Sequence, residues 1–141
     1  MSETQTIQFE LVSPEEKLVS EPVKMAVIPG VEGEFGVLAG HASLVAALQP
    51  GVVELYGEGS DEARKIFIAG GFADVTGEQC SVLAEQAVNL NELNQEEIEQ
   101  KVTDLNEDLN MAEEAADKTR IQRRLDLENA KLAAVSGRLT V

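Results

Sequence analysis

The sequence EGEFGVLAGHASL occupies residues 32–44, and Pro50 and Gly51 follow shortly after it. Glycine recurs in it at positions 33, 36 and 40 between short apolar groups, and glycine accepts the backbone angles of tight corners. The pattern predicts a short strand framed by turns rather than a helix. No lysine or arginine lies between Met25 and Ala63, and the pattern G-x-x-x-x-G-K-(S/T) is missing, so this is not a phosphate-binding loop.

The rest of residues 1–91 repeats this rhythm of short apolar runs and turn residues. Ile7, Phe9 and Leu11 alternate with other residues, as in a strand with one buried face. Further runs follow at a spacing of about ten residues, which is typical of a β-sandwich or barrel, and we expect a β-sandwich of about 8–10 strands. These runs are Val23–Ile28, which Pro29 and Gly30 should end, Leu44–Leu48, Val52–Tyr56, Ile66–Ala69, Phe72–Val75 and Cys80–Ala84.

The pattern changes after Leu90, because the remaining residues include one glycine, Gly137, and no proline. Apolar side chains now recur at intervals of four and three, which predicts amphipathic helices packed as a C-terminal antiparallel two-helix hairpin. We therefore expect a sandwich domain over 1–91 and a two-helix domain over 92–141. The first seam is Ile98, Val102, Leu105, Leu109 and Ala112, and the second is Ala115, Ala116, Thr119, Leu125, Leu132 and Val135. The expected boundaries are an N-cap at Asn91 or Asn94, a break near 110–114 and a stop at Gly137.

The composition excludes several classes of partner. A formal net charge of -15, from 26 acids and 11 bases, would repel nucleic acid and anionic membrane surfaces. No apolar run approaches the roughly 20 residues that span a bilayer. Residues 1–6 are polar rather than a signal or transit peptide. The single cysteine, Cys80, cannot form a disulfide within the chain and fits a reducing compartment.

Charge is also segregated within the helical half. Residues 92–117 contain 10 acids and one base, whereas residues 118–141 contain two acids and six bases. Two explanations remain open, and both can hold. The acidic first helix can neutralise the basic second helix beside it, or the second helix can dock on an acidic surface elsewhere.

Catalytic and metal-binding signatures are missing. His41 is the only histidine, and no G-x-S-x-G pattern accompanies it. One histidine and one cysteine far apart in sequence lack the spacing of metal ligands. We expect His41 to be a loop residue that contacts a neighbour, and Cys80 to be a small buried hydrophobic residue.

The 32–44 segment together with Pro50 and Gly51 resembles the E-G-E-(L/F)-G-(I/V)-x-x-G-H-x-x-L…P-G signature of the epsilon subunit of F-type ATP synthases of the bacterial type. The resemblance covers the chain in length and layout. It implies a non-catalytic central-stalk (rotor) subunit, without a cofactor, that couples rotation of the gamma subunit to the proton-driven c-ring. The sandwich would bind gamma and the c-ring, and the helices could inhibit ATP hydrolysis through the beta and alpha subunits. The implied location is peripheral, on the cytoplasmic face of the bacterial inner membrane as part of F1, with no direct membrane insertion.

The same resemblance indicates site residues. Glu34 and His41 are candidates for partner contact, and Arg120, Arg123 and Arg124 are candidates for the regulatory helix. Some bacterial epsilon subunits carry an ATP-binding motif, (I/L)-D-x-x-R-A, where this chain has residues 93–98. Asn94 replaces the acid of that motif and Glu97 replaces its base, which places negative charge where phosphate should lie. We therefore expect no ATP site here.

Two other classes of function fit the residues alone. The chain could be a free-standing protein–protein interaction module with no ATP synthase role, which would not purify together with alpha, beta and gamma subunits. A weaker alternative is an enzyme that uses the His41 loop, which would require turnover by the isolated chain.

Overall fold

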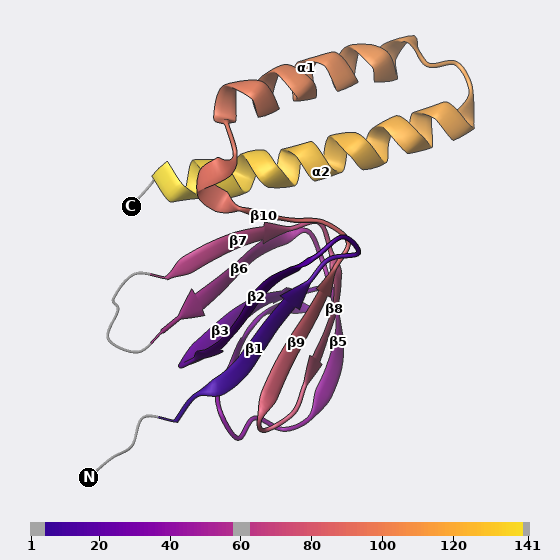
Figure 1. The fold of residues 1–141 in the computed structure, drawn as a ribbon. Helices are drawn as coiled ribbons and strands as arrows, with labels where there is room; N and C mark the ends of the chain where they lie inside the picture. Colours follow the sequence, from indigo (N-terminus) through magenta and orange to yellow (C-terminus); the bar gives the residue numbers. More distant parts are fainter. Residues whose placement is uncertain (1–4, 58–62, 140–141) are drawn as a thin grey trace. The chain divides into compact units, whose positions relative to one another are not determined.

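The computed structural model describes residues 5–57 and 63–139. Residues 1–4 of the polar amino terminus and the side chain of Arg138 lie outside the described part. The chain divides into two compact units, Met1–Asn89 and Leu90–Val141. The described residues of the first unit form strands and those of the second form helices, which confirms the predicted fold class (Figure 1).

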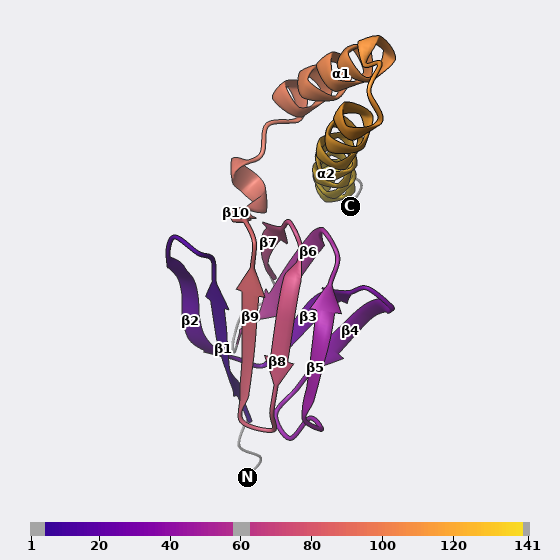
Figure 2. The ribbon, with the colours of Figure 1, turned by 90° about the vertical axis from the view of Figure 1, so that its right-hand side faces the viewer.

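The first unit is a β-sandwich. Its described strands are β1 (Ile7–Val12), β2 (Lys17–Val23), β3 (Met25–Gly30), β4 (Gly33–Val37), β5 (Leu44–Leu48), β6 (Gly51–Tyr56), β7 (Arg64–Ile68), β8 (Gly71–Val75), β9 (Gln79–Ala84) and β10 (Ala87–Asn89). They form one hydrogen-bonded sheet in the order β10-β7-β6-β3-β5-β8-β9-β1-β2, with β4 paired to β3. The sheet folds over into two layers, with β5, β8, β9, β1 and β2 in the nearer one (Figure 2). The only residue pair that joins β3 to β5 within the described residues is Gly30 with Leu48, so the layers meet there.

The sandwich core consists of inward-facing aliphatic side chains and few aromatic ones. Ile7, Phe9 and Leu11 are fully buried, as their alternation predicts. They pack with buried residues of other strands, including Ile28 and Val75, in one cluster. The order of the strands therefore fixes which side chains of each strand remain on the outside.

Two details of the strands differ from the sequence prediction. The strands β2 and β10 are absent from the predicted runs, and in β2 the proline Pro22 and the polar residues around it obscure the alternation. A proline is compatible with β2, which forms one end of the strand order. The strand β3 ends at Gly30, but Pro29 and Gly30 belong to it instead of following it, and they pair with Glu34 and Gly33 of β4.

The second unit contains a 3-10 turn, η1 (Leu90–Glu92), followed by α1 (Gln95–Met111) and α2 (Ala115–Leu139). Asn94 is the N-cap of α1, and its side-chain oxygen accepts a hydrogen bond from the backbone nitrogen of Glu97 at 3.2 Å. The prediction that Gly137 ends the second helix is wrong, because α2 continues to Leu139. A glycine inside a helix costs only about 1 kcal/mol relative to alanine, which the rest of the helix can offset.

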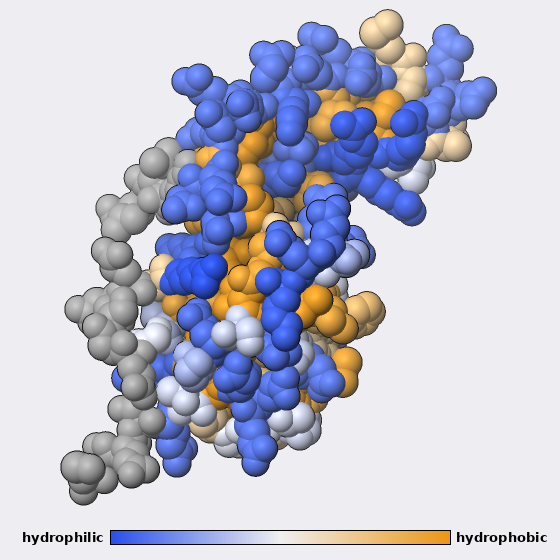
Figure 3. Space-filling view, in the orientation of Figure 1, coloured by the Kyte–Doolittle hydropathy of each residue, from blue (hydrophilic) through white to orange (hydrophobic). Residues whose placement is uncertain are grey.

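The helical hairpin has a small core. Leu105, Ile121 and Leu125 are buried together, and Val102, Leu109 and Ala112 pack partly against them. Val102, Leu105, Leu109 and Ala112 of the predicted α1 seam thus lie in this core, whereas Ile98 is buried but is not part of the cluster. In α2 the prediction missed Ile121, whereas Ala115, Ala116 and Thr119 are exposed and lie outside the seam. Hydrophilic residues cover most of the hairpin surface that is visible in Figure 3. Neither described helix is long and apolar enough to cross a membrane.

Candidate protein interface

An apolar row crosses the outer face of the sandwich. Ala47 of β5 pairs with Phe72 of β8, Phe72 pairs with Leu83 of β9, and Leu83 pairs with Val12 of β1. Paired residues of neighbouring strands lie side by side on one face. We call Ala47, Phe72, Leu83 and Val12 the apolar row. Phe72 is 58% exposed and Leu83 is 57% exposed, so the row has no cover within the described sandwich.

The next row on this face carries charge. Val45, which is 73% exposed, pairs with Asp74, and Asp74 pairs with Ser81. Ser81 pairs in turn with Glu10, whose carboxylate lies 3.6 Å from the ammonium group of Lys17. Asp74 has no ion pair among the described residues. The face therefore combines exposed apolar side chains with an unpaired carboxylate, which is a surface for a protein partner rather than for a small ligand.

The two contact candidates predicted from the sequence lie at different ends of this sheet. Glu34 is exposed on β4 and pairs with Pro29, next to the Gly30 and Leu48 pair. His41 lies just before the opposite end of β5, and its Nδ1 is 2.6 Å from the carbonyl oxygen of Ala42. The backbone nitrogen of Gly40 donates to the carbonyl of Gly77, which ties this loop to the turn between β8 and β9. The structure does not bring Glu34 and His41 together.

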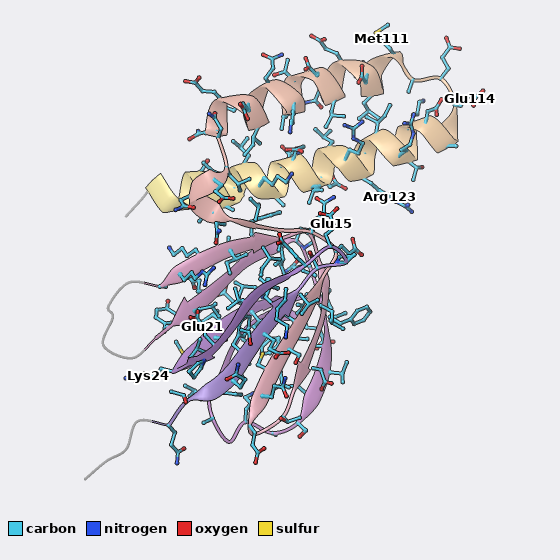
Figure 4. All side chains as sticks on the ribbon, viewed as in Figure 1. Glu15, Glu21, Lys24, Met111, Glu114 and Arg123 are labelled. Atoms are coloured by element: carbon cyan, nitrogen blue, oxygen red, sulfur yellow. The ribbon has the colours of Figure 1, made fainter. Side chains whose placement is uncertain are left out.

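The arginine cluster, Arg120, Arg123 and Arg124, is exposed on α2. Arg120 pairs with Asp117 at 3.3 Å within the same helix, whereas Arg123 and Arg124 have no ion pair among the described residues. Arg123 projects from the side of α2 that faces away from α1 (Figure 4). No ion pair joins α1 to α2 in the described part of the chain. Direct pairing with the acidic helix therefore does not account for these bases.

The start of α1 is acidic. An open hollow of about 660 Å³ is lined there by the segment from Asn91 to Glu96 and by Glu99. Its charged lining residues are all glutamates, and the Asn94 side chain already caps the helix. A triphosphate would meet repulsion at this position.

The described residues contain no other group poised for chemistry. Among residues 5–57 and 63–139 no cluster of histidine, cysteine and carboxylate side chains could hold a metal ion. Cys80 is buried, and burial together with the charge of Asp74 raises the pKa of its thiol to about 12, so the reactive thiolate is disfavoured.

The apolar row is not apparent from the sequence. Each of its residues follows the alternation of its own strand, but their neighbourhood depends on the pairing of strands distant in sequence. The available signal was the presence of Phe72 and Leu83 at positions that alternate with the buried Ala73 and Val82.

Comparison with known proteins gives a consistent result. A family model described as the β-sandwich domain of the ATP synthase delta/epsilon chain matches residues 6–90. The ATP synthase epsilon chain of Rhodospirillum centenum is 42% identical over 134 residues, which cover 92% of this chain and 92% of that protein. The epsilon chain of Rhodospirillum rubrum is 41% identical, over 94% of this chain and 98% of that protein.

Solved structures agree with the sequence relatives. A chain of the mitochondrial ATP synthase of Euglena gracilis, in a structure of OSCP, F1 and the c-ring, matches with a TM-score of 0.82 and 29% identity, over 92% of this chain and 81% of that chain. A chain of the central stalk and c-ring of the Tetrahymena thermophila mitochondrial ATP synthase matches with a TM-score of 0.67 and 12% identity, over 95% of this chain and 99% of that chain. The second match concerns the fold alone.

Proposed function

Because the chain belongs to the family of ATP synthase epsilon chains, we propose that it is a non-catalytic central-stalk (rotor) subunit that couples the gamma subunit to the proton-driven c-ring. It contributes no active site to the complex. Its role is to transmit torque, so it must stay bound to its partner subunit while the assembly rotates.

The apolar row carries this proposal. A rotor subunit needs a broad surface that stays bound under torque, and exposed apolar side chains on a rigid sheet supply binding free energy without reordering the backbone. Phe72 and Leu83 present such side chains from two adjacent strands. We assign this face to the gamma subunit.

Glu34 and His41 are assigned to contacts with other rotor subunits. Glu34 and His41 lie at separate ends of β5, so one protein surface of ordinary size need not cover both. Val31 is exposed close to Glu34, and Leu38 is exposed close to His41. Each candidate thus belongs to a small mixed patch, and the c-ring and gamma are the partners that the family membership suggests for them.

The helical hairpin is assigned a regulatory role. Arg123 and Arg124 are exposed without an ion pair among the described residues, so they are available to an acidic surface. We assign that surface to the beta subunit, with alpha beside it, and expect the contact to inhibit ATP hydrolysis. In a bacterium such a subunit is peripheral, on the cytoplasmic face of the inner membrane as part of F1.

Reconstitution with F1 depleted of its epsilon subunit tests the proposal. The full chain should bind the particle and lower its ATPase rate. A chain that ends at residue 91 should still bind, because it retains the apolar row, but should leave the rate unchanged. Failure of the full chain to bind would instead favour a free-standing interaction module.

A further inference from the structure

A pocket lies at one end of the apolar row. Its volume is about 310 Å³, at the lower end of the range of about 300–1,000 Å³ for small-molecule sites and large enough for one large side chain. Phe72, Leu83 and Val12 of the apolar row form one wall. The other lining residues are Ser13, Pro14, Gly71, Ala84 and Glu85.

The walls of the pocket are held by backbone hydrogen bonds. The turn between β1 and β2 is closed by the Ser13 nitrogen, which donates to the Glu16 carbonyl at 2.9 Å. Figure 4 marks this turn at Glu15. On the other side the Glu85 nitrogen donates to the Gly70 carbonyl at 3.1 Å. A pocket with a fixed backbone loses little entropy when it is filled.

Gly71 allows β8 and β9 to approach closely at the edge of the pocket. Its φ of +143° is a conformation that side chains rarely adopt, and an added Cβ would lie 2.0 Å from the carbonyl oxygen of Leu83. The position can therefore hold only glycine in this fold. The absence of a side chain there lets the backbones of β8 and β9 lie in close contact beside Phe72, which fixes this wall of the pocket.

The charge around the pocket is negative. Glu85 is exposed, and its carboxylate has no ion pair or side-chain hydrogen bond among the described residues. Lys17 is the strand partner of Val12, which lines the pocket, but its ammonium group already forms an ion pair with Glu10. A cation from a partner would thus find an unpaired carboxylate at the edge of an apolar cavity.

We propose that this pocket receives one large apolar side chain of the gamma subunit, from a segment whose neighbouring lysine or arginine pairs with Glu85. The inference rests on the proposed rotor function, and it specifies where the binding free energy is concentrated. Interfaces of this kind depend on a few anchors in well-packed pockets, surrounded by contacts that contribute little.

The test measures the Kd of the full chain, labelled at its amino terminus, for epsilon-depleted F1. Phe72→Ala removes a wall of the pocket and should weaken binding at least tenfold. Val45→Ala is the matched control, because Val45 is equally apolar and exposed on the same face but does not line the pocket, and it should change Kd less than threefold. All altered side chains are exposed, so the melting temperature should fall by less than the roughly 4–8 °C that a loss of 1 kcal/mol causes in a domain of this size.

The charge is tested separately. Glu85→Lys should weaken binding about tenfold at low salt and less at high salt, and Glu85→Gln should have a smaller effect. Glu78→Lys makes the same charge change at the other end of the β8–β9 hairpin and should leave Kd unchanged. Equal losses for Phe72→Ala and Val45→Ala, or for Glu85→Lys and Glu78→Lys, would overturn the anchor while leaving the rotor function intact. If the unaltered chain fails to bind F1, the rotor function itself is wrong and the anchor with it.

Discussion

The sandwich and the hairpin bury very different amounts of apolar surface. The sandwich core joins 18 buried residues of the described strands in one cluster, whereas the hairpin core joins three. Apolar burial is the main source of folding free energy, so the hairpin should open at a much lower cost than the sandwich. The chain thus combines a rigid platform with a segment that can change conformation.

The ion pairs also differ between the sandwich and the hairpin. In the sandwich, Arg64 of β7 pairs with Glu21 of β2, and Lys65 pairs with Glu54 on the adjacent strand. In the hairpin both described ion pairs, Arg120 with Asp117 and Lys131 with Glu128, are internal to α2. Between α1 and α2 the described contacts are therefore those of the apolar seam, and disrupting that seam should release the hairpin.

The largest effect is expected from the sandwich core. Phe9→Ala should lower the free energy of unfolding by about 3–5 kcal/mol, because Phe9 is fully buried and leaves a cavity. Phe72→Ala is the matched control on the same sandwich and should cost less than about 1 kcal/mol. Urea titration of both variants measures the difference. Similar losses for the two would contradict the assignment of inner and outer faces.

A smaller and local effect is expected in the hairpin. Leu105→Asp buries a charge without a partner and should cost about 3 kcal/mol or more, enough to separate the helices. Met111→Asp is the control on the same helix, since Met111 is 80% exposed. Amide exchange should accelerate in α1 and α2 of Leu105→Asp only, while Cys80 in the sandwich stays slow to alkylate. Equal protection of the helices in both variants would show that the seam is assigned wrongly.

The sequence predicted what depends on local pattern. The alternation of Ile7, Phe9 and Leu11 identified a strand and its buried face, and the spacing of Val102, Leu105 and Leu109 identified the seam of α1. The seam of α2 was only partly identified. The small residues Ala115 and Ala116 suggested a buried face of the helix that does not include Ile121. The sequence of a helix with two possible apolar faces does not show which face is buried against the partner helix.

The candidate site was harder to predict, since it depends on strand pairing. Phe72 and Val12 are distant in sequence and share a row only because β9 lies between β8 and β1. The glycine-rich segment gave Glu34 and His41, but its hairpin places them at separate ends of the sheet. Spacing along the sequence reveals neither the apolar row nor the separation of Glu34 from His41. For the same reason the pocket beside Gly71 could not be predicted.

The basic side chains of α2 should affect the turnover of the complex. Reversal of Arg120, Arg123 and Arg124 to Glu should raise the ATPase rate of the inhibited F1 complex about threefold or more, because exposed charge pairs each contribute about 0.2–1 kcal/mol and three are reversed. Added salt should have the same effect on the unaltered complex, since it screens charges beyond about 8–10 Å. Lys101→Glu on α1 is the control and should leave the rate unchanged. An unchanged rate beside a loosened hairpin would mean that the arginines only balance the charge of α1.

The smallest effect is expected from ATP. The hollow at the start of α1 is lined by Glu92, Glu96 and Glu99, and the Asn94 side chain is engaged as the helix cap. A ligand at free concentration c stabilises a folded unit by RT ln(1 + c/Kd), so ATP at a concentration far below its Kd has almost no effect on stability. Titration calorimetry should therefore show no saturable heat, and ATP should leave the amide protection of both helices unchanged. Micromolar affinity would contradict this, and it would require phosphate contacts from other cations, with Arg123 and Arg124 the first to be replaced. In that case ATP would stabilise the hairpin but not the sandwich, and the low cost of opening the hairpin would depend on the nucleotide instead of being a fixed property of its small core.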